Sequence, residues 1–208
     1  MARKTKAEAA LTRDRIVTCA RQVFSRDGVT NTSLEQVAKE AGVTRGAVYW
    51  HFRDKADLFM AVRQQTGILL RFSDFKTGDA LRRLETGLHE ALRRLVLDPQ
   101  ARETYEVMLW KCEYVGAFAG VRKDLMSAGT LFLSETTELY AEAVRAKLVS
   151  ADLDPRLAAR ETFCFYAGML KLWLADEGGQ AVRDDILRVI THHVDSRRLR
   201  RAVGQKAV

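Results

Sequence analysis

The sequence predicts an all-α protein of about nine helices, and three observations point to that fold class. Its 208 residues include only two prolines and thirteen glycines, so few residues interrupt long helices. Apolar residues recur at helical spacing, and no segment shows the alternation of a half-buried strand. Hydrophobic residues make up 47% of the chain and charged residues 29%, a balance that supports a packed core rather than disorder.

The first expected helix covers residues 12–27. Gly28 follows it directly, and glycine is the residue that most readily takes the left-handed conformation that ends a helix. We expect one face of this helix to be buried, because its apolar residues fall on a single stripe. These residues are Ile16, Val17, Ala20, Val23 and Phe24.

Two short helices joined by a tight turn are expected between residues 32 and 52. Ser33 and Gln36 have the spacing of a capping box, in which each side chain hydrogen-bonds the backbone amide of the other residue. Gly42 can supply the positive φ of the turn, and the small Ala38 lets the two helices cross closely. This arrangement predicts a helix-turn-helix.

A fourth helix is expected over 54–72, and longer helices follow it. Both prolines stand directly after an aspartate, as Asp98-Pro99 and Asp154-Pro155. An aspartate N-cap followed by proline marks a helix start, since the amide proton that proline lacks would have no partner there. The later helices are expected over 80–97, 100–115, 121–148, 155–175 and 181–196.

A change in composition over 73–79 sets the first four helices apart from the rest of the chain. We expect residues 1–53 to form an N-terminal arm and a helix-turn-helix head. Residues 54–208 are expected to form a larger helical body with a basic C-terminal tail.

Residues suited to reading DNA gather on the helix that Thr44 is expected to cap. Arg45, at its N-terminus, can pair with O6 and N7 of a guanine, which is worth about 1–3 kcal/mol of discrimination. Gly46 lets the helix approach the groove floor, although it costs about 1 kcal/mol of helix propensity. Side chains with polar tips can bind phosphate oxygens and position the head. The predicted DNA-binding residues are Thr32, Ser33, Thr44, Arg45, Gly46, Tyr49, Trp50, His51 and Lys55.

A simpler interpretation of these residues is also open. Tyr49, Trp50 and His51 could cover a hydrophobic hinge, while Arg45 and Lys55 remain solvated surface charges. The glycine turn, the paired caps and the arginine at the helix tip all agree with DNA reading, and we favour that interpretation.

The charge balance favours a polyanionic partner. The formal net charge is +7 and the isoelectric point about 9.5, which suits nucleic acid or an acidic membrane surface. No signal peptide is recognisable, and no run of 18 uncharged residues could span a membrane. We therefore expect a soluble, cytoplasmic protein with no membrane partner.

Nothing in the sequence indicates an enzyme. Cys19, Cys112 and Cys164 lie far apart without a CxxC pair, which predicts reduced thiols rather than disulfides or a zinc site. Cys112 beside Glu113 lacks the base and orienting group of a nucleophilic site. The patterns HExxH, P-loop and G-x-S-x-G are missing from the sequence. We therefore expect no catalytic residue, no metal and no cofactor.

The helix-turn-helix resembles that of a known family. Residues 41–59 read AGVTRGAVYWHFRDKADLF, and the segment 32–59 is similar to the helix-turn-helix of TetR-family repressors. The opening MARKTK and residues 111–116, KCEYVG, resemble the AcrR-type regulators of multidrug efflux pumps. The resemblance implies a homodimeric repressor that binds a palindromic operator in double-stranded DNA and controls an efflux pump operon.

The resemblance also implies that the last two helices, 155–175 and 181–196, form the dimer interface. Independently, the last helix carries more apolar residues than a solvent-facing terminal helix needs. These residues are Ile186, Leu187, Val189, Ile190 and Val194.

The resemblance further implies a body pocket for a small hydrophobic or aromatic inducer, whose binding moves the fourth helix and separates the heads. Aromatic walls with a few polar groups suit such ligands, although the same residues could simply fill a core. Residues 63–67 include no acid, which lowers the expectation of purely cationic ligands. The predicted ligand-binding residues are Leu88, Leu92, Tyr105, Leu109, Cys112, Phe132, Thr136, Phe163, Tyr166 and Leu170.

Other functions remain open from the sequence. A TetR-type regulator of another pathway would respond to a metabolite. A thiol redox sensor would release DNA on oxidation of Cys112 or Cys164. A DNA packer or an RNA-binding module would show little preference among duplexes.

Overall fold

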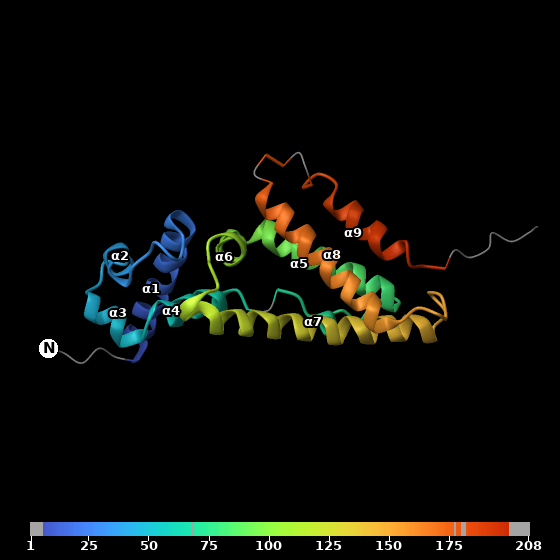
Figure 1. Cartoon of the computed structure of the whole chain (residues 1–208), viewed down its shortest axis with the longest axis horizontal. Coiled ribbons are helices and arrows are strands. Elements are labelled where there is room, and N and C mark those ends of the chain that lie inside the picture. The colour runs from blue at the N-terminus through green and yellow to red at the C-terminus, as the bar shows by residue number, and fades with distance from the viewer. Residues whose placement is uncertain (1–5, 68, 177, 180–181, 200–208) are drawn as a thin grey trace, which may run out of the picture. The chain divides into compact units, whose positions relative to one another are not determined.

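The computed structural model describes residues 6–67, 69–176, 178–179 and 182–199. Within this part of the chain all regular structure is helical, which confirms the predicted all-α class (Figure 1). Two short 3-10 helices accompany the α-helices there, η1 (Phe72–Asp74) and η2 (Gly116–Phe118). The α-helices are α1 (Lys6–Asp27), α2 (Leu34–Glu40), α3 (Arg45–His51), α4 (Lys55–Gln65), α5 (Ala80–Leu97), α6 (Pro99–Trp110), α7 (Ala119–Arg145), α8 (Pro155–Ala175) and α9 (Ile186–Asp195).

The chain folds into two compact units. The head unit comprises Met1–Leu69 and Arg94–Met126, and the body unit comprises Leu70–Arg93 and Ser127–Val208. The head unit therefore contains α6 in addition to α1, α2, α3 and α4, and the division falls within α5 and α7. The boundary expected at residue 53 separates the helix-turn-helix from the rest of the chain by function. The division into compact units follows packing and does not test that boundary.

The core of the head unit forms where α1 packs against α2, α4 and α6. Phe24 of α1 and Phe59 of α4 are buried, with their ring centroids 6.2 Å apart. Val107 of α6 is fully buried in the same core. The apolar stripe predicted for the first helix is the buried face of α1. Helix α6 thus supports the helix-turn-helix from residues far along the chain.

The core of the body unit is built on leucines of α5. Leu84, Leu88 and Leu92 are buried, as their shared stripe predicts. The phenol of Tyr166 in α8 donates a hydrogen bond to the carbonyl oxygen of Leu88 at 3.2 Å. This bond ties α8 to α5 beside the leucines.

Helix α4 ends at Gln65 and not near residue 72 as predicted. The hydroxyl of Thr66 donates to the carbonyl oxygen of Arg63 at 2.8 Å, and Gly67 takes a φ of +62°. Glycine adopts this left-handed conformation without a steric penalty, so the chain leaves the helix there.

Helix α6 ends at Trp110 rather than at 115, because the backbone of Lys111 is used elsewhere. The carbonyl oxygen of Lys111 accepts a hydrogen bond from the amide of Val29 at 2.8 Å. That bond joins the end of α6 to the loop between α1 and α2. Helix α1 also differs from the prediction, since it begins at Lys6 instead of residue 12.

The last helices differ from prediction at their ends. Helix α7 covers 119–145 rather than 121–148, and Lys147 just after it has a φ of +56°. Helix α9 begins at Ile186, not at 181, a position that itself lies outside the described residues.

The apolar residues of α9 divide between two faces. Ile186, Ile190 and Val194 are buried within the body unit. Leu187 and Val189 point away from this core, and their exposed fractions are 50% and 39%. Only part of the apolar set predicted for an interface is therefore available to a partner.

Candidate nucleic-acid interface

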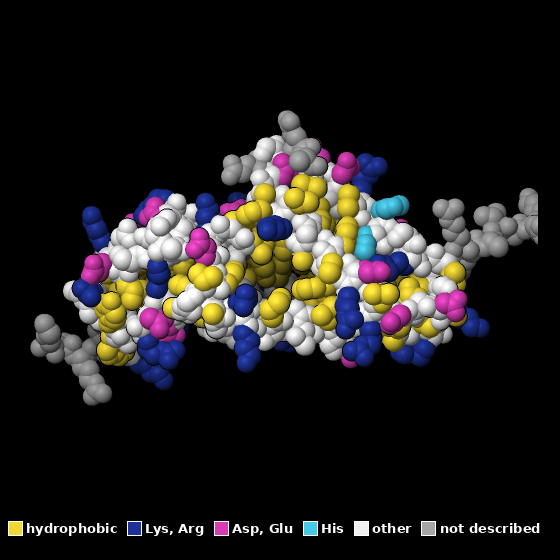
Figure 2. Space-filling view, in the orientation of Figure 1, with side chains coloured by type: hydrophobic (Ala, Val, Ile, Leu, Met, Phe, Trp, Pro, Cys, Tyr) yellow, Lys and Arg dark blue, Asp and Glu magenta, His cyan; other side chains and the backbone are white. Residues whose placement is uncertain are grey.

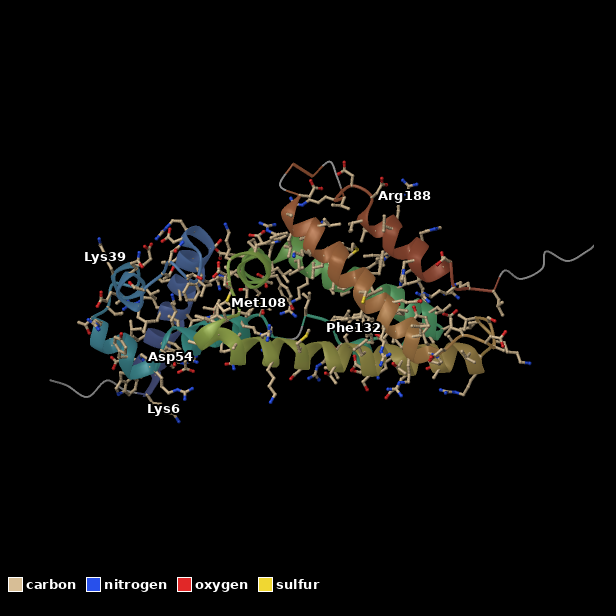
Figure 3. The ribbon with its side chains drawn as sticks, viewed as in Figure 1. Lys6, Lys39, Asp54, Met108, Phe132 and Arg188 are labelled. Atoms are coloured by element: carbon tan, nitrogen blue, oxygen red, sulfur yellow. The ribbon has the colours of Figure 1, made fainter. Side chains whose placement is uncertain are left out.

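The predicted helix caps of the head are all present. The Ser33 hydroxyl accepts from the Gln36 amide at 3.2 Å, and the Gln36 side chain accepts from the Ser33 amide at 2.6 Å, which completes the capping box. The Thr44 hydroxyl accepts from the Ala47 amide at 3.2 Å. The Asp54 carboxylate, at the start of α4 in Figure 3, caps that helix. These bonds fix where α2, α3 and α4 begin.

The turn between α2 and α3 has the predicted geometry. Gly42 takes a φ of +60°, and no other atom lies within 4 Å of the place where its Cβ would be. Conformation rather than crowding therefore calls for glycine here. Val48 and Phe52 are buried and hold the inner face of α3 against the head core. The other face of α3 is left open to solvent.

Aromatic side chains stand out from α3. Trp50 is 73% exposed and Tyr49 47% exposed, so neither covers an apolar hinge. The His51 ring lies edge-on to the Trp50 ring, with centroids 4.5 Å apart. Exposed aromatic residues next to a polar ring are available to a partner.

Arg45 occupies the N-terminus of α3 and makes two contacts. Its Nη1 forms an ion pair with Oε1 of Glu35, on α2, at 2.5 Å. Its Cζ lies 5.3 Å from the centroid of the Tyr49 ring, one turn further along α3. Hydrogen bonding to Tyr49 and the charge of Glu35 raise the pKa of Arg45, so the guanidinium stays cationic.

Gly46 has no role in the packing of the head. A Cβ built there would have only the Thr44 hydroxyl within 4 Å, at an ordinary contact distance of 4.0 Å. Its φ is not in the left-handed range that favours glycine. Neither crowding nor conformation within the head explains why this helical position lacks a side chain.

Two predicted phosphate-binding side chains are engaged inside the head. The Thr32 hydroxyl is buried and donates to the carbonyl oxygen of Gly28 at 2.7 Å. The Lys55 ammonium donates to the carbonyl oxygens of Thr30 and Thr32, each at 2.8 Å. An ammonium group has three protons, so one donor of Lys55 remains beyond these two bonds.

Arg13 is a candidate that the sequence reasoning missed. Its guanidinium lies over the Phe52 ring, 5.1 Å from the centroid, and this brings a cation of α1 to the end of α3. The position on α1 follows from the helical pattern, but the meeting with Phe52 depends on how α1 and α3 cross. That crossing has no local signal in the sequence.

Seven of the predicted ligand-binding residues belong to the body unit. The Phe132 ring, labelled on α7 in Figure 3, lies 5.4 Å from Phe163 and 6.2 Å from Tyr166, measured between centroids. These three rings form an aromatic cluster, with Phe72 5.3 Å from Phe132. The remaining four residues are all buried: Leu88, Leu92, Thr136 and Leu170.

Thr136, one turn after Phe132, is fully buried and its hydroxyl has no hydrogen-bond partner. Thr162 of α8 is also fully buried, but its hydroxyl lies 2.7 Å from the Tyr140 hydroxyl and 3.0 Å from Nε2 of His193. An unpaired buried hydroxyl costs about 1–3 kcal/mol. Such a group marks a place where a polar atom of a ligand or a water can bind.

Tyr105, Leu109 and Cys112 belong to the head unit. Burial raises the pKa of Tyr105 to about 12 and that of the Cys112 thiol to about 11. Leu109 is exposed. Glu106, one turn before Trp110 on the same helix, forms an ion pair with Arg102 at 3.8 Å.

A metal site would need clustered ligands, and a membrane span a long apolar helix, within the described ranges. No group of three or more His, Cys, Asp or Glu side chains is placed there to hold a metal ion. No helix in the same ranges combines the length and apolarity needed to cross a membrane.

A capped helix-turn-helix with an arginine at the tip of its second helix, in one chain with a helical body, defines a helical transcription regulator. Residues 16–62 match the bacterial regulatory proteins of the tetR family, and residues 79–196 match the C-terminal region of MAATS-type transcriptional repressors. The chain belongs to the TetR family.

Relatives and solved structures agree with this family along most of the chain. The HTH-type transcriptional regulator AcrR of Shigella flexneri is 37% identical over 84% of this chain and 83% of its own length. TtgR of Pseudomonas putida is 32% identical over 96% of this chain and 97% of its own length. The crystal structure of NalD, the secondary repressor of the MexAB-OprM multidrug efflux pump in Pseudomonas aeruginosa, matches with a TM-score of 0.82 at 28% identity, over 94% and 99%.

Proposed function

We propose that this protein is a ligand-responsive repressor that binds a palindromic operator as a homodimer and controls a multidrug efflux operon. The observation that carries the DNA-reading part is Gly46, which the head does not need for its own packing. A helix that must approach a groove floor accounts for the missing side chain, and Arg45 stands beside it to read a guanine.

The remaining residues of the surface position the head on the DNA backbone. Thr44, Tyr49 and His51 present polar groups, and Trp50 presents an exposed ring and an N–H donor. Lys55 contributes its third donor, and Arg13 adds a cation from α1. Ser33 and Thr32 order the start of α2, from which backbone amides can reach a phosphate.

Control of an efflux operon is supported by what the relatives are named for. NalD is described as a repressor of a multidrug efflux pump, and BepR of Brucella suis, 34% identical over 85% of this chain, as a transcriptional repressor. A regulator of another pathway, which responds to a metabolite, would have the same features in its head. The identity of the ligand distinguishes that function from control of an efflux operon.

The aromatic cluster of the body unit supports a small hydrophobic or aromatic inducer. Phe132, Phe163 and Tyr166 offer ring faces, and Thr136 offers a hydroxyl without an internal partner. A ligand with an aromatic ring and one polar atom would satisfy both features. Such a ligand must bind the head-separated state more tightly, because equal affinity for two states shifts neither.

Dimerisation through α8 and α9 is supported by apolar side chains that the body unit leaves exposed. Figure 2 shows hydrophobic side chains at the surface over these two helices, beside histidines. Leu172 of α8 and Leu187 of α9 are each at least half exposed. Large exposed apolar side chains on neighbouring helices mark interaction surfaces more often than solvent faces.

The thiol-sensor alternative has less physical support at Cys112 than at Cys164, which is exposed. Burial raises the pKa of Cys112 to about 11, and it also raises the pKa of Cys19. The reactive form of cysteine is the thiolate, so a raised pKa slows oxidation near neutral pH. We propose no enzymatic activity and a place in the bacterial cytoplasm, where the operator DNA lies.

The test is a titration of operator binding against ligand binding. A palindromic duplex selected by the protein from a randomised pool serves as the operator, and a scrambled duplex of equal composition as the control. Aromatic antibiotics and dyes are first ranked by calorimetry for direct binding. A ligand that induces should weaken operator affinity, and by reciprocity the operator should weaken the binding of that ligand by the same factor. Flat operator affinity in the presence of tight ligands would refute induction.

A further inference from the structure

We propose that Glu35 of α2 is a specificity-determining residue. In the free protein its carboxylate restrains Arg45, and on operator DNA a guanine takes the place of that carboxylate as the partner of Arg45. The inference rests on the proposed function, in that α3 is taken as the reading helix. It concerns how the head discriminates between operator and other DNA. Neither the resemblance nor the helix-turn-helix pattern assigns a role to this glutamate.

The restraint is visible in the contacts of Arg45. Its guanidinium lies against the Glu35 carboxylate at 2.5 Å and over the Tyr49 ring at 5.3 Å, so it is bound on two sides. Both members of the ion pair are solvent-exposed, with exposed fractions of 64% for Arg45 and 60% for Glu35. The arginine is therefore held at the surface of the head without being removed from reach of DNA.

The pair adds little to the stability of the head. Exposed ion pairs contribute about 0.2–1 kcal/mol, and salt screens them further. A carboxylate beside a DNA-binding arginine also repels every phosphate that approaches. Glu35 therefore weakens binding to DNA in general, and a gain in discrimination accounts for its presence there.

The gain in discrimination follows from the hydrogen bonds that Arg45 makes with DNA once it leaves Glu35. A guanine offers two acceptors in the plane of the guanidinium, O6 and N7, and so makes two parallel hydrogen bonds. A phosphate of non-specific DNA offers charge without the base-specific geometry and competes directly with the carboxylate already bound. Release of Arg45 is thus favourable at a guanine and much less so elsewhere.

An alternative explanation for Glu35 is its place in the first turn of α2, where an acid interacts favourably with the helix dipole. This interpretation predicts an effect on stability and none on discrimination. Glu40, at the end of the same helix, provides a matched control, because it also forms a surface ion pair, with Arg26 at 3.7 Å. Changing either glutamate to glutamine alters the net charge by the same amount.

The experiment measures affinity for the selected palindromic duplex and for its scrambled control by fluorescence anisotropy at several salt concentrations. For Glu35→Gln we expect tighter binding to the scrambled duplex and a specificity ratio that falls roughly two- to fivefold, the range that an exposed ion pair can supply. For Glu40→Gln we expect both affinities to change by one common factor. Thermal unfolding of each variant confirms that the head is folded.

A double-variant cycle assigns the effect to the pair. In an Arg45→Ala background, Glu35→Gln should leave the specificity ratio unchanged, since no arginine remains to be restrained. Two results would overturn the restraint. One is a ratio that Glu35→Gln and Glu40→Gln change alike; the other is selective loss of operator affinity in Glu35→Gln, which would show Glu35 accepting from a cytosine amine. If the unaltered protein itself binds both duplexes equally, the DNA-reading proposal fails instead.

Discussion

The reading surface of the head unit and the aromatic cluster of the body unit are built by different interactions. In the head, hydrogen bonds between residues three apart fix the starts of α2, α3 and α4, as between Thr44 and Ala47. In the body, Phe132 meets Phe163 and Tyr166 from another helix, through packing alone. Local bonds depend on neighbouring residues in the sequence, whereas long-range packing depends on the whole chain.

One buried polar side chain of the head also differs from one of the body in its hydrogen bonding. Arg21 of the head is 2% exposed, and its Nε and Nη1 are paired with Glu103 at 2.8 Å and Gln65 at 3.0 Å. Thr136 of the body is equally buried and lacks a partner. Buried polar groups with hydrogen-bond partners stabilise one arrangement of the side chains. A buried group without a partner carries a desolvation cost, which a hydrogen bond to a ligand would recover. Arg21 is thus held by two partners, while the Thr136 hydroxyl has none.

The largest expected effect is on the head. Glu103→Ala should lower the free energy of unfolding by about 3 kcal/mol, because it leaves the buried charge of Arg21 uncompensated. Urea denaturation measures the change. Glu106→Ala removes a more exposed ion pair on the same helix and should cost about 1 kcal/mol or less. Equal losses in the two variants would contradict a special role for the Arg21 cluster.

The next largest effect is a pH dependence of the free energy of unfolding, which arises from a partly buried histidine of the body unit. Burial, then the charge of Arg197, lowers the pKa of His193 to about 4. The folded state therefore favours neutral histidine, so this stability is complete above pH 6.5 and is lost as the pH falls towards 4. The loss should amount to about 1–3 kcal/mol. Denaturation curves at pH 7.5 and 5 should show it, and His193→Gln should reduce it. His192→Gln, on the exposed neighbour, serves as the matched control.

A pair of isosteric substitutions tests the unpaired hydroxyl. Thr136→Val should raise the free energy of unfolding by about 1 kcal/mol, since it removes a buried polar group without a partner, and should weaken inducer binding. Thr162→Val should lower stability by a similar amount, because it breaks contacts to Tyr140 and His193. Calorimetry with a bound aromatic ligand and thermal melts measure both. Destabilisation by both variants would mean that Thr136 is satisfied by an internal water.

The smallest expected effect on stability carries the sharpest information about the head. Gly46→Ala should stabilise the fold by up to about 1 kcal/mol, since alanine favours a helix and has room there. Operator affinity should fall at the same time, because the added methyl meets the groove floor. Melting temperature and anisotropy, measured on one preparation, check both signs. Unchanged operator affinity would show that Gly46 does not approach DNA.

The sequence was informative about the head because its signals are local. The capping box at Ser33 and Gln36, the cap at Thr44 and the turn at Gly42 each depend on residues within a few positions. All of them are present as predicted. The end of α6 was predicted wrongly because the Lys111 carbonyl bonds to Val29, more than eighty residues away.

The sequence could predict which residues belong to the candidate sites, but not which hydrogen bonds their side chains make. Helical spacing placed Thr136 one turn from Phe132, but it did not reveal that the hydroxyl lacks a partner. Likewise the pattern singled out Lys55 as a cation near the reading helix, and two of its donors prove to bond backbone carbonyls of the head. Hydrogen-bond satisfaction is set by the folded environment, which a single sequence does not specify.

The bond between Val29 and Lys111 has a consequence for how the protein is made and engineered. A helix-turn-helix cut out at residue 53 would lose Val107 from its core and Glu103, the ion-pair partner of Arg21, both supplied by α6. On the ribosome, the head completes its core only after α6 has emerged. A chimeric regulator that borrows this reading head must therefore carry α6 with it.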